Sequence, residues 1–230
     1  MFEVEAGWLE KVLSRLSTEC LSPCIDLGSS DFVYRTEFQP WIDERVFKPL
    51  ALRGVAIHHC DLKNAPGVDV VADLMNDEGR TRIMRIAPNS VLCCNILEHV
   101  AEPAAFASRL ASLLGPGGYL VLNVPHRYPY HEDPIDNGFR PEIQEVAALF
   151  PDFSVVEAAV LEAGSYREEV ARQPLRILTR HFARLLLPFL GLQKWKRSVA
   201  RLSYLFRSYE VTCLLLVKGD LVSEVRFAED

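Results

Sequence analysis

The 230-residue sequence has no apolar run that is long enough to cross a membrane. Its longest such run, Leu185–Leu192, contains Pro188 and is far shorter than the ~20 residues that a membrane-spanning helix needs. The first residues, Met1–Glu5, lack the basic stretch followed by apolar residues that marks a secretory signal. The sequence also shows no internal repeat and no low-complexity tract. We therefore expect a globular, cytoplasmic protein.

The sequence has six cysteines but no Cys-x-x-Cys pair, which is a spacing typical of structural zinc sites. Five of the six lie in apolar, strand-like segments, where a thiol packs as a small hydrophobic side chain. We therefore expect reduced thiols in the core of a cytosolic protein. The six residues are Cys20, Cys24, Cys60, Cys93, Cys94 and Cys213.

Acidic residues are missing from one long stretch, Val170–Ser208, although the whole chain has a net charge of −6. Nine basic residues make this stretch +9, so the remainder of the chain carries −15. An asymmetry this large indicates a specialised surface. The basic residues are Arg172, Arg176, Arg180, Arg184, Lys194, Lys196, Arg197, Arg201 and Arg207.

Short apolar runs alternate with segments of helical periodicity along the rest of the chain. Hydrophobic residues make up 49% of the sequence, which is enough for a substantial core. The alternation predicts an α/β fold in one domain, residues 1–230: a doubly wound, mostly parallel seven-stranded sheet with helices on both faces. A basic, amphipathic helical insertion at 165–208 precedes the last strand. The expected strands are Cys24–Leu27, Val55–Cys60, Val68–Ala72, Val91–Cys94, Tyr119–Val124, Phe153–Leu161 and Tyr209–Val217.

Acidic or amide residues stand at the ends of four predicted strands: Asp26, Asp61, Asp73 and Asn95. In a doubly wound fold the ends of parallel strands meet at one edge of the sheet, where ligands bind. Gly28 follows the first strand and has no Cβ, so its backbone can approach a ligand closely. The pattern predicts a ligand site at this edge. The same aspartates are also common caps of turns and helices.

Several stretches of the chain resemble the class I S-adenosylmethionine-dependent methyltransferases. Ile25–Gly28 is similar to the first motif of that family, and Asp61 stands where the family has an acidic residue after its second strand. Asn95–Val100 and Leu113–Leu120 are similar to its fourth-strand motif and to the turn that leads into its fifth strand. The resemblance implies that the last two strands pair antiparallel at one edge of the sheet.

This resemblance implies S-adenosylmethionine as the cofactor. Asp61 would accept hydrogen bonds from the ribose hydroxyls, Asp73 would flank the adenine, and Asp26 would contact the ammonium group. Glu98 lies at the mouth of the implied pocket, or alternatively caps the start of the following helix. The implied cofactor-binding residues are Asp26, Gly28, Ser29, Ser30, Asp61, Asp73, Leu74, Asn95 and Glu98.

The first motif departs from the family pattern of acid-x-Gly-x-Gly-x-Gly, because Ser30 and Phe32 replace the second and third glycines. Two interpretations follow. The loop holds the cofactor through backbone groups and serine hydroxyls, or the protein is a catalytically degenerate methyltransferase fold that serves as a binding or scaffold subunit. The missing glycines also argue against a dinucleotide-binding fingerprint.

The polar loop after the fifth strand, His126–Arg140, is the expected acceptor site. Histidine can act as a general base near neutral pH, so His126 and His131 are candidate catalytic residues, with Asp133 as an orienting group or alternative base. The loop is alternatively a turn whose histidines bind backbone groups. His131, Asp133 and Asp136 are an alternative set of ligands for a divalent metal, but their loop spacing is a weak pattern for one, and no metal is expected. The candidate substrate-binding residues are His99, Tyr128, Tyr130, Asn137 and Arg140.

We thus expect a methyltransferase that methylates an oxygen of a sugar, a glycan intermediate or a related small molecule. The basic stretch 170–208 suits peripheral contact with an anionic membrane, which would place the protein at the inner face of that membrane. Its alternative role is a lid packed on the domain. Nucleic acid is not expected as a partner, because the chain is acidic overall and carries no recognisable RNA-binding module.

Overall fold

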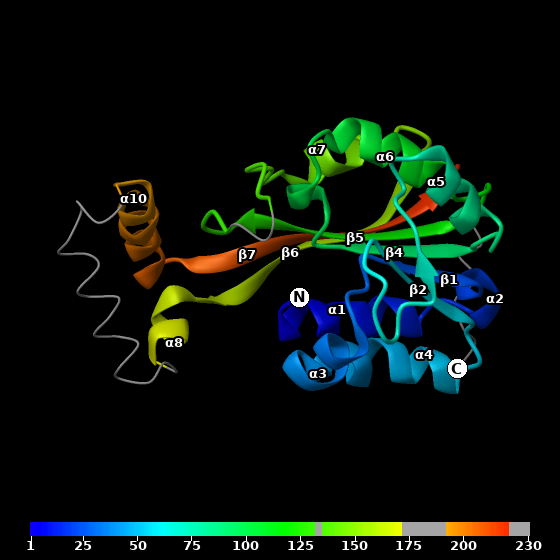
Figure 1. Ribbon diagram of the computed structural model, residues 1–230, viewed down its shortest axis with the longest axis horizontal. Coiled ribbons are helices and arrows are strands. Elements are labelled where there is room, and N and C mark those ends of the chain that lie inside the picture. Colours follow the sequence, from blue (N-terminus) through cyan, green and yellow to red (C-terminus); the bar gives the residue numbers. More distant parts are fainter. Residues whose placement is uncertain (132–134, 172–191, 221–230) are drawn as a thin grey trace.

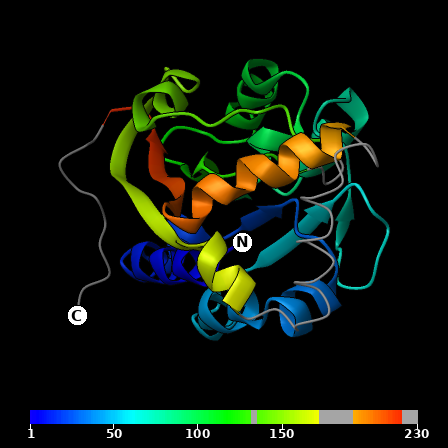
Figure 2. The same cartoon turned by 90° about the vertical axis from the view of Figure 1, so that its left-hand side faces the viewer.

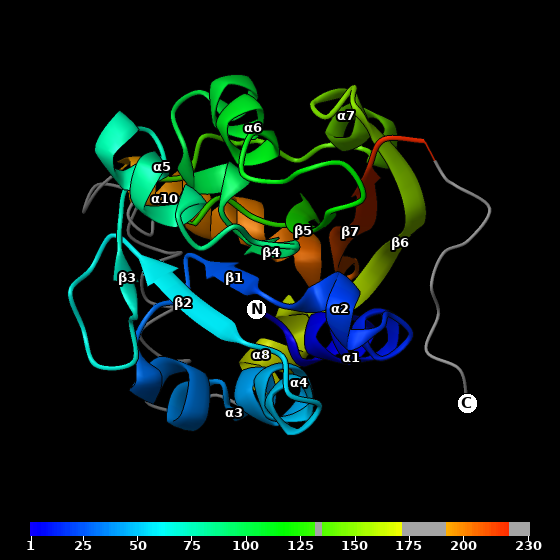
Figure 3. The same ribbon diagram turned by 90° about the vertical axis from the view of Figure 1, so that its right-hand side faces the viewer.

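A computed structural model of the chain describes residues 1–131, 135–171 and 192–220. Seven strands form one sheet in the order β3-β2-β1-β4-β5-β7-β6. Neighbouring strands from β3 to β5 pair in parallel, and β7 runs antiparallel to both β5 and β6. Figure 3 shows the sheet from the end at which β3, β2 and β1 can be followed in order. The strands are β1 (Cys24–Leu27), β2 (Ile57–Asp61), β3 (Val70–Val71), β4 (Ser90–Cys94), β5 (Tyr119–Arg127), β6 (Phe153–Ser165) and β7 (Ser208–Lys218).

Helices cover both faces of the sheet (Figure 1). The helices α1 to α4 pack on one face and α5 to α7 on the other, while α8 and α10 lie beyond the sheet. The α-helices are α1 (Glu3–Ser14), α2 (Thr18–Leu21), α3 (Pro40–Ile42), α4 (Lys48–Leu52), α5 (Asp77–Met84), α6 (Pro103–Ala111), α7 (Ile143–Ala148), α8 (Tyr166–Ala171) and α10 (Leu192–Arg201). The other helical turns are η1 (Tyr34–Phe38), η2 (Asp43–Phe47), η3 (Leu97–His99) and η5 (Leu202–Leu205).

The predicted doubly wound sheet is confirmed, and so is the antiparallel pairing of its last two strands. The bounds of most strands differ from the predicted ones, by one to four residues at an end. At the N-terminus, α1 is followed by a separate short helix, α2, which the Ser17 hydroxyl caps. Strand β5 continues to Arg127, because β7 pairs with it through a bulge as far as Glu210.

The core has two parts, one on each face of the sheet. Ile25 and Leu120 are buried on the face beneath α5, α6 and α7, whereas Leu92 and Val121 are buried on the face beneath α1, η2 and α4. The two sets come from alternate positions of central strands, because successive side chains of a strand point to opposite faces. The central strands are therefore buried on both faces, and their carboxyl ends form a rigid edge for a ligand site.

All six cysteines have free thiols, and four of them are fully buried. This agrees with the prediction of reduced residues in the core. Within the described ranges, no helix combines the length and apolar character that crossing a bilayer requires. Helices α8 and α10 and the turn η5 lie in the predicted 165–208 insertion. The basic residues Arg172, Arg176, Arg180 and Arg184 lie outside the described residues.

Candidate functional site

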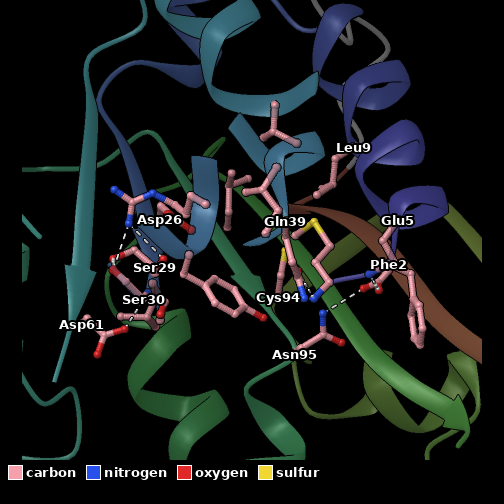
Figure 4. Close-up of a pocket in the computed structure, with 18 of the residues that line it drawn as sticks. Phe2, Glu5, Leu9, Asp26, Ser29, Ser30, Gln39, Asp61, Cys94 and Asn95 are labelled. Atoms are coloured by element: carbon pink, nitrogen blue, oxygen red, sulfur yellow. Dashed lines mark hydrogen bonds between the residues drawn. The ribbon is translucent and has the colours of Figure 1, made fainter. Parts of the chain in front are cut away.

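A cavity of about 820 Å³ opens at the carboxyl ends of β1, β2 and β4 (Figure 4). Its walls come from the loop after β1, from η1 to η2, from the end of β2, from the turn after β4, and from the loop after β5. The first residues of the chain close the remaining side. Five acidic residues line it, Glu5, Asp26, Asp31, Asp61 and Glu98, against two basic ones, Arg35 and Lys63. The site therefore favours a positively charged or hydroxyl-rich ligand.

The loop after β1 has a left-handed backbone at two positions. Gly28 has φ +74°, and a Cβ built there would lie only 2.7 Å from Cδ1 of Ile96. Glycine is thus required by conformation and by space. Ser30, in place of the second glycine of the family pattern, has φ +55°, which is uncommon for a residue with a side chain. The loop therefore keeps a glycine-like path at Ser30.

Arg35 holds this path in place from the inside of the loop. It is 4% exposed, and its guanidinium donates hydrogen bonds to the carbonyls of Ser29, Ser30 and Gly67 at 2.7–3.0 Å. Three carbonyls from two segments are thus tied to one side chain. The rigid fork of the guanidinium suits this task better than a single ammonium group. The sequence contained no motif that marks Arg35 for this role.

Asp61 stands at the end of β2 and faces the same loop. Its Oδ2 accepts a hydrogen bond from the Ser30 N–H at 2.7 Å, and its Oδ1 accepts one from the Lys63 N–H at 3.0 Å. A carboxylate has about four lone-pair sites, so both oxygens can still accept from a ligand. The carboxylate thus combines a fixed orientation with free acceptor capacity.

Asp26, at the end of β1, is paired with a histidine of the neighbouring strand. Its Oδ2 lies 2.8 Å from Nδ1 of His59, and the His59 ring meets the Phe47 ring edge-on at 4.7 Å. Only 8% of Asp26 is exposed, although the residue lines the cavity. This pairing gives His59 a structural role, which is to fix the carboxylate of Asp26.

A buried carboxylate on α1 lies at the opposite side of the cavity. Glu5 is fully buried, and its Oε1 accepts hydrogen bonds from the side-chain amides of Asn95 at 2.9 Å and Asn123 at 3.2 Å. Its Oε2 accepts from the Phe2 N–H at 2.5 Å. Asn95 has φ +55°, so the amide bond to Glu5 accompanies a left-handed turn after β4. Glu5 thereby joins the N-terminal helix to the ends of two strands.

The turn after β4 and the loop after β5 supply the wall formed by Glu98, His99 and His131. Glu98 is 1% exposed, and burial raises the pKa of its carboxyl to about 8. Its Oε1 lies 3.7 Å from Nε2 of His99. The rings of His99 and His131 meet edge-on at 5.1 Å, and Tyr128 meets His131 at 5.3 Å. Residues from two parts of the sequence thus form one polar wall.

Asp136 and Arg140 shape the loop that carries His131. Both oxygens of Asp136 accept hydrogen bonds from Arg140, at 2.6 and 3.1 Å, and Oδ2 also accepts from the His131 N–H at 2.9 Å. Burial alone raises the pKa of the Asp136 carboxyl, but hydrogen bonds from Arg140, His131 and Gly138 hold it below its usual value. Arg140 does not line the cavity. It acts on the loop and reaches the site through Asp136.

Four other predicted site residues also lie outside the cavity lining. Leu74 is buried in the core, and Asp73 accepts a hydrogen bond from the Met75 N–H. Tyr130 is 39% exposed, and the Asn137 amide donates to the carbonyls of Leu97 and Val100.

His126 is also placed away from the cavity. Its Nδ1 contacts the carbonyl of Pro141 at 3.1 Å and the hydroxyl of Thr212 at 3.2 Å, on the side of the sheet where β7 lies. Asp133, the third predicted catalytic residue, lies outside the described residues. His131 alone of the three is described at the cavity. The predicted cofactor residues that line it are Asp26, Gly28, Ser29, Ser30, Asp61, Asn95 and Glu98.

No protein-family model matches the chain, and no curated protein matches its sequence. Solved structures do match it. A putative sarcosine dimethylglycine methyltransferase from Galdieria sulphuraria has a TM-score of 0.54 at 12% identity, over 95% of this chain and 85% of that one. Coclaurine N-methyltransferase, bound to N-methylheliamine and SAH, has a TM-score of 0.49 at 17% identity, over 85% of this chain and 67% of that one. The N-methyltransferase NodS from Bradyrhizobium japonicum WM9 has a TM-score of 0.46 at 8% identity, over 95% and 86%.

The strand order and the antiparallel β7 agree with the match to the Galdieria protein, which covers nearly the whole chain. The chain therefore has the Rossmann-like fold of the class I S-adenosylmethionine-dependent methyltransferases.

Proposed function

We propose that the protein is an S-adenosylmethionine-dependent methyltransferase that methylates an oxygen of a small polar acceptor, such as a sugar or a glycan intermediate. One observation carries this proposal. The cavity at the strand ends brings the acid of β2, Asp61, into hydrogen-bond contact with the loop after β1. The two segments that would hold the two ends of the cofactor are thus one connected unit.

The residues of the cavity fit this cofactor in size and in charge. Ligand pockets of about 300–1,000 Å³ hold molecules of drug-like size, and the cavity measures about 820 Å³. When bound, S-adenosylmethionine supplies a methyl group on a positively charged sulfur. Its two cationic centres suit a lining in which four acids besides Glu98 outnumber two bases, while Glu98, with a pKa of about 8, is mostly uncharged at neutral pH. One of these bases, Arg35, is already occupied by three backbone carbonyls.

Each end of the cavity has groups for one part of the cofactor. The Asp61 carboxylate would accept hydrogen bonds from the ribose hydroxyls. Gly28 leaves room for the backbone to approach the ligand, while Asn95 and Asp26 offer polar contacts for the amino-acid end. Asp26 is held by His59 and Asn95 by Glu5, so these contacts are oriented before a ligand arrives. Such preorganisation lowers the entropic cost of binding.

The acceptor would lie against the wall of His99, Tyr128 and His131. Tyr128 packs on Phe2 and Tyr209, with ring centroids at 5.7 and 4.8 Å, which makes this wall partly aromatic. Aromatic faces combined with polar groups suit a sugar-like molecule. A hydroxyl acceptor must lose its proton as it receives the methyl group, and a histidine nitrogen can take that proton near neutral pH. Alignment of the acceptor with the methyl group would supply much of the rate.

The first prediction is that Asp61→Ala weakens S-adenosylmethionine binding by about 10- to 100-fold. The reason is the loss of charge-assisted hydrogen bonds, each of which contributes about 1.5–3 kcal/mol. Isothermal titration calorimetry with S-adenosylmethionine and S-adenosylhomocysteine measures the effect. Asp152→Ala, which removes an exposed aspartate outside the cavity, should bind as the unchanged protein does.

An unchanged affinity in Asp61→Ala would refute the assignment to ribose. The absence of any binding by the unchanged protein at millimolar cofactor would favour the second interpretation, a degenerate methyltransferase fold that acts as a binding or scaffold subunit. The replacement of the family glycines by Ser30 and Phe32 supports that alternative. The left-handed backbone at Ser30 counts against it, because the path of the loop is retained there.

A further inference from the structure

Three side chains at the acceptor wall form a cluster with the composition of a metal site. Glu98, His99 and His131 each bring one ligand atom to within 4.8 Å of the other two. All three residues line the cavity. Ligand atoms around a tetrahedral ion lie about 3.5 Å apart, since metal–nitrogen and metal–oxygen bonds measure about 2.0–2.2 Å. Side-chain movements of about 1–1.5 Å would therefore bring the cluster into coordination geometry.

Glu98 is the member whose environment is hardest to explain without a ligand. It is 1% exposed, yet its Oε2 has no hydrogen-bond partner among the residues that the structure describes. Its Oε1 lies 3.7 Å from Nε2 of His99, which is too long for a hydrogen bond. Buried polar atoms are nearly always hydrogen-bonded or bound to an ion. A carboxyl group buried at the cavity wall thus has one oxygen without a partner among the described residues and the other near, but not bonded to, His99.

The two histidines are oriented as metal-binding histidines are. Nδ1 of His99 lies 2.5 Å from the carbonyl of Ile135, so Nδ1 carries the proton and Nε2 is left with its lone pair. Nδ1 of His131 lies 3.4 Å from the Asp136 carboxylate, which Arg140 holds in turn. Backbone carbonyls and carboxylates behind a histidine fix its tautomer and raise its basicity at metal centres.

We propose that Glu98, His99 and His131 bind a divalent transition-metal ion such as Zn²⁺, Mn²⁺, Fe²⁺ or Co²⁺. Two histidines and one carboxylate favour these ions over Ca²⁺ and Mg²⁺, which prefer sites built from oxygen alone. Three protein ligands leave coordination positions open. Because the cluster lies in the cavity wall, those positions face the cavity and would accept an oxygen atom of water or of a bound molecule.

The role of the ion in catalysis rests on the proposed function, whereas its binding does not. In a methyltransferase the ion would coordinate the acceptor oxygen and lower the pKa of the acceptor hydroxyl. His131 would then serve as a ligand instead of a general base, and solvent water would take the proton of the acidified hydroxyl. Coordination by the ion would restrict the acceptor to a molecule with a hydroxyl or carboxylate that can reach the metal.

Metal binding can be tested without cofactor or acceptor. Full-length, tag-free protein is treated with a chelator, dialysed and titrated with Co²⁺. We expect one ion per chain, with the visible d–d absorption of cobalt bound by nitrogen and oxygen ligands. In thermal unfolding, Zn²⁺ at about 100 times its Kd should raise the Tm by about 5–10 °C. Both effects should be lost in Glu98→Gln and in His131→Gln.

His126→Gln is the matched control, because His126 lies outside the cavity and should leave both signals unchanged. The His131 side chain is 26% exposed, so its replacement should disturb folding less than that of Glu98. His131→Gln therefore keeps the test valid if Glu98→Gln fails to fold. A flat cobalt titration of the unchanged protein overturns the proposal, and so does a Tm shift that persists in His131→Gln. If metal binds but S-adenosylmethionine does not, the metal site stands and the proposed function fails.

Discussion

Glu98 is a buried acid whose protonation makes stability depend on pH. Burial raises the pKa of its carboxyl from 4.5 to about 8 in the folded protein. Between these two values the folded state holds a proton that the unfolded state has lost. The free energy of unfolding therefore falls as the pH rises from about 4.5 to 8, and the full loss is present above pH 8.

The expected size of this loss is on the order of 4 kcal/mol. Urea unfolding of the metal-free protein in chelator, at several pH values, measures it. Glu98→Gln has no charge to lose, so it should lack this slope and should be the more stable protein at pH 9. If the free energy of unfolding depends on pH in the same way in both proteins, the pKa of Glu98 is not raised in the folded state.

Some residues of the cavity could be predicted from the sequence, and others could not. Asp61 and Gly28 stand beside strand ends, so their positions at the cavity followed from the pattern of strands and from the family motifs. Glu5 gave no such signal, because its partners Asn95 and Asn123 are 90 and 118 residues away. An acid in the first turn of an amphipathic helix usually faces solvent. Only the packing of α1 on the sheet makes this one a buried acceptor.

The loop between β1 and η1 is the element on which cofactor binding depends. Its path is fixed by Gly28, by the Ser30–Asp61 hydrogen bond, and by Arg35 inside it. We predict that Arg35→Ala lowers the free energy of unfolding by about 3 kcal/mol, because three hydrogen bonds to a buried cation are lost. We also expect weaker binding of S-adenosylmethionine, because Ser30 is no longer held against Asp61.

Chemical denaturation and calorimetry measure the two effects. Arg35→Lys should recover little of either, since one ammonium cannot reach three carbonyls in the geometry of a guanidinium. Arg85→Ala, which removes an exposed arginine, is the control and should behave as the unchanged protein. Full stability with an unchanged Kd in Arg35→Ala would mean that the loop is held by its backbone alone.

At the level of elements, all seven predicted strands are present, because each is a compact apolar run ended by a polar residue or a turn. Their lengths were harder to predict. Strand β6 pairs with β7 as far as Ser165, four residues beyond its predicted end at Leu161, whereas β7 begins at Ser208, one residue before its predicted start. Antiparallel pairing supplies the hydrogen bonds there, and it leaves little trace in the pattern of hydrophobic residues.

The β6–β7 hairpin extends beyond the rest of the sheet. Together with the helices α8 and α10 at its end, it forms a projection that we call the arm. Figure 1 shows α8 and α10 at the end of this hairpin, beyond the edge at which β5 ends. Figure 2 views the molecule from this side, with both helices in front of the sheet. The parallel strands end on the same side of the molecule. The arm therefore projects from the side on which the cavity opens at their carboxyl ends.

Charge is distributed unequally between the region of the arm and the rest of the molecule. The stretch 170–208 carries +9, and the rest of the chain −15. In its described part, Lys196, Arg207 and Phe206 are exposed, Phe206 by 91%. We propose that this arm contacts anionic membrane surfaces, for which exposed basic and aromatic side chains are suited. A membrane acceptor would then meet the molecule on the side of its cavity.

The prediction is that the protein sediments with liposomes that contain phosphatidylserine or cardiolipin, and not with neutral ones. Each basic residue near an anionic surface contributes about 1 kcal/mol, so Lys196→Glu/Arg207→Glu should weaken binding by at least about 20-fold. Lys11→Glu/Arg85→Glu makes the same change of charge on exposed residues outside the arm and serves as control. Binding should also fall as salt is raised, because exposed charges are screened. Equal sedimentation with neutral liposomes would refute recognition of anionic lipid. Equal loss of binding in both double variants would show that net charge, and not the arm, governs the interaction.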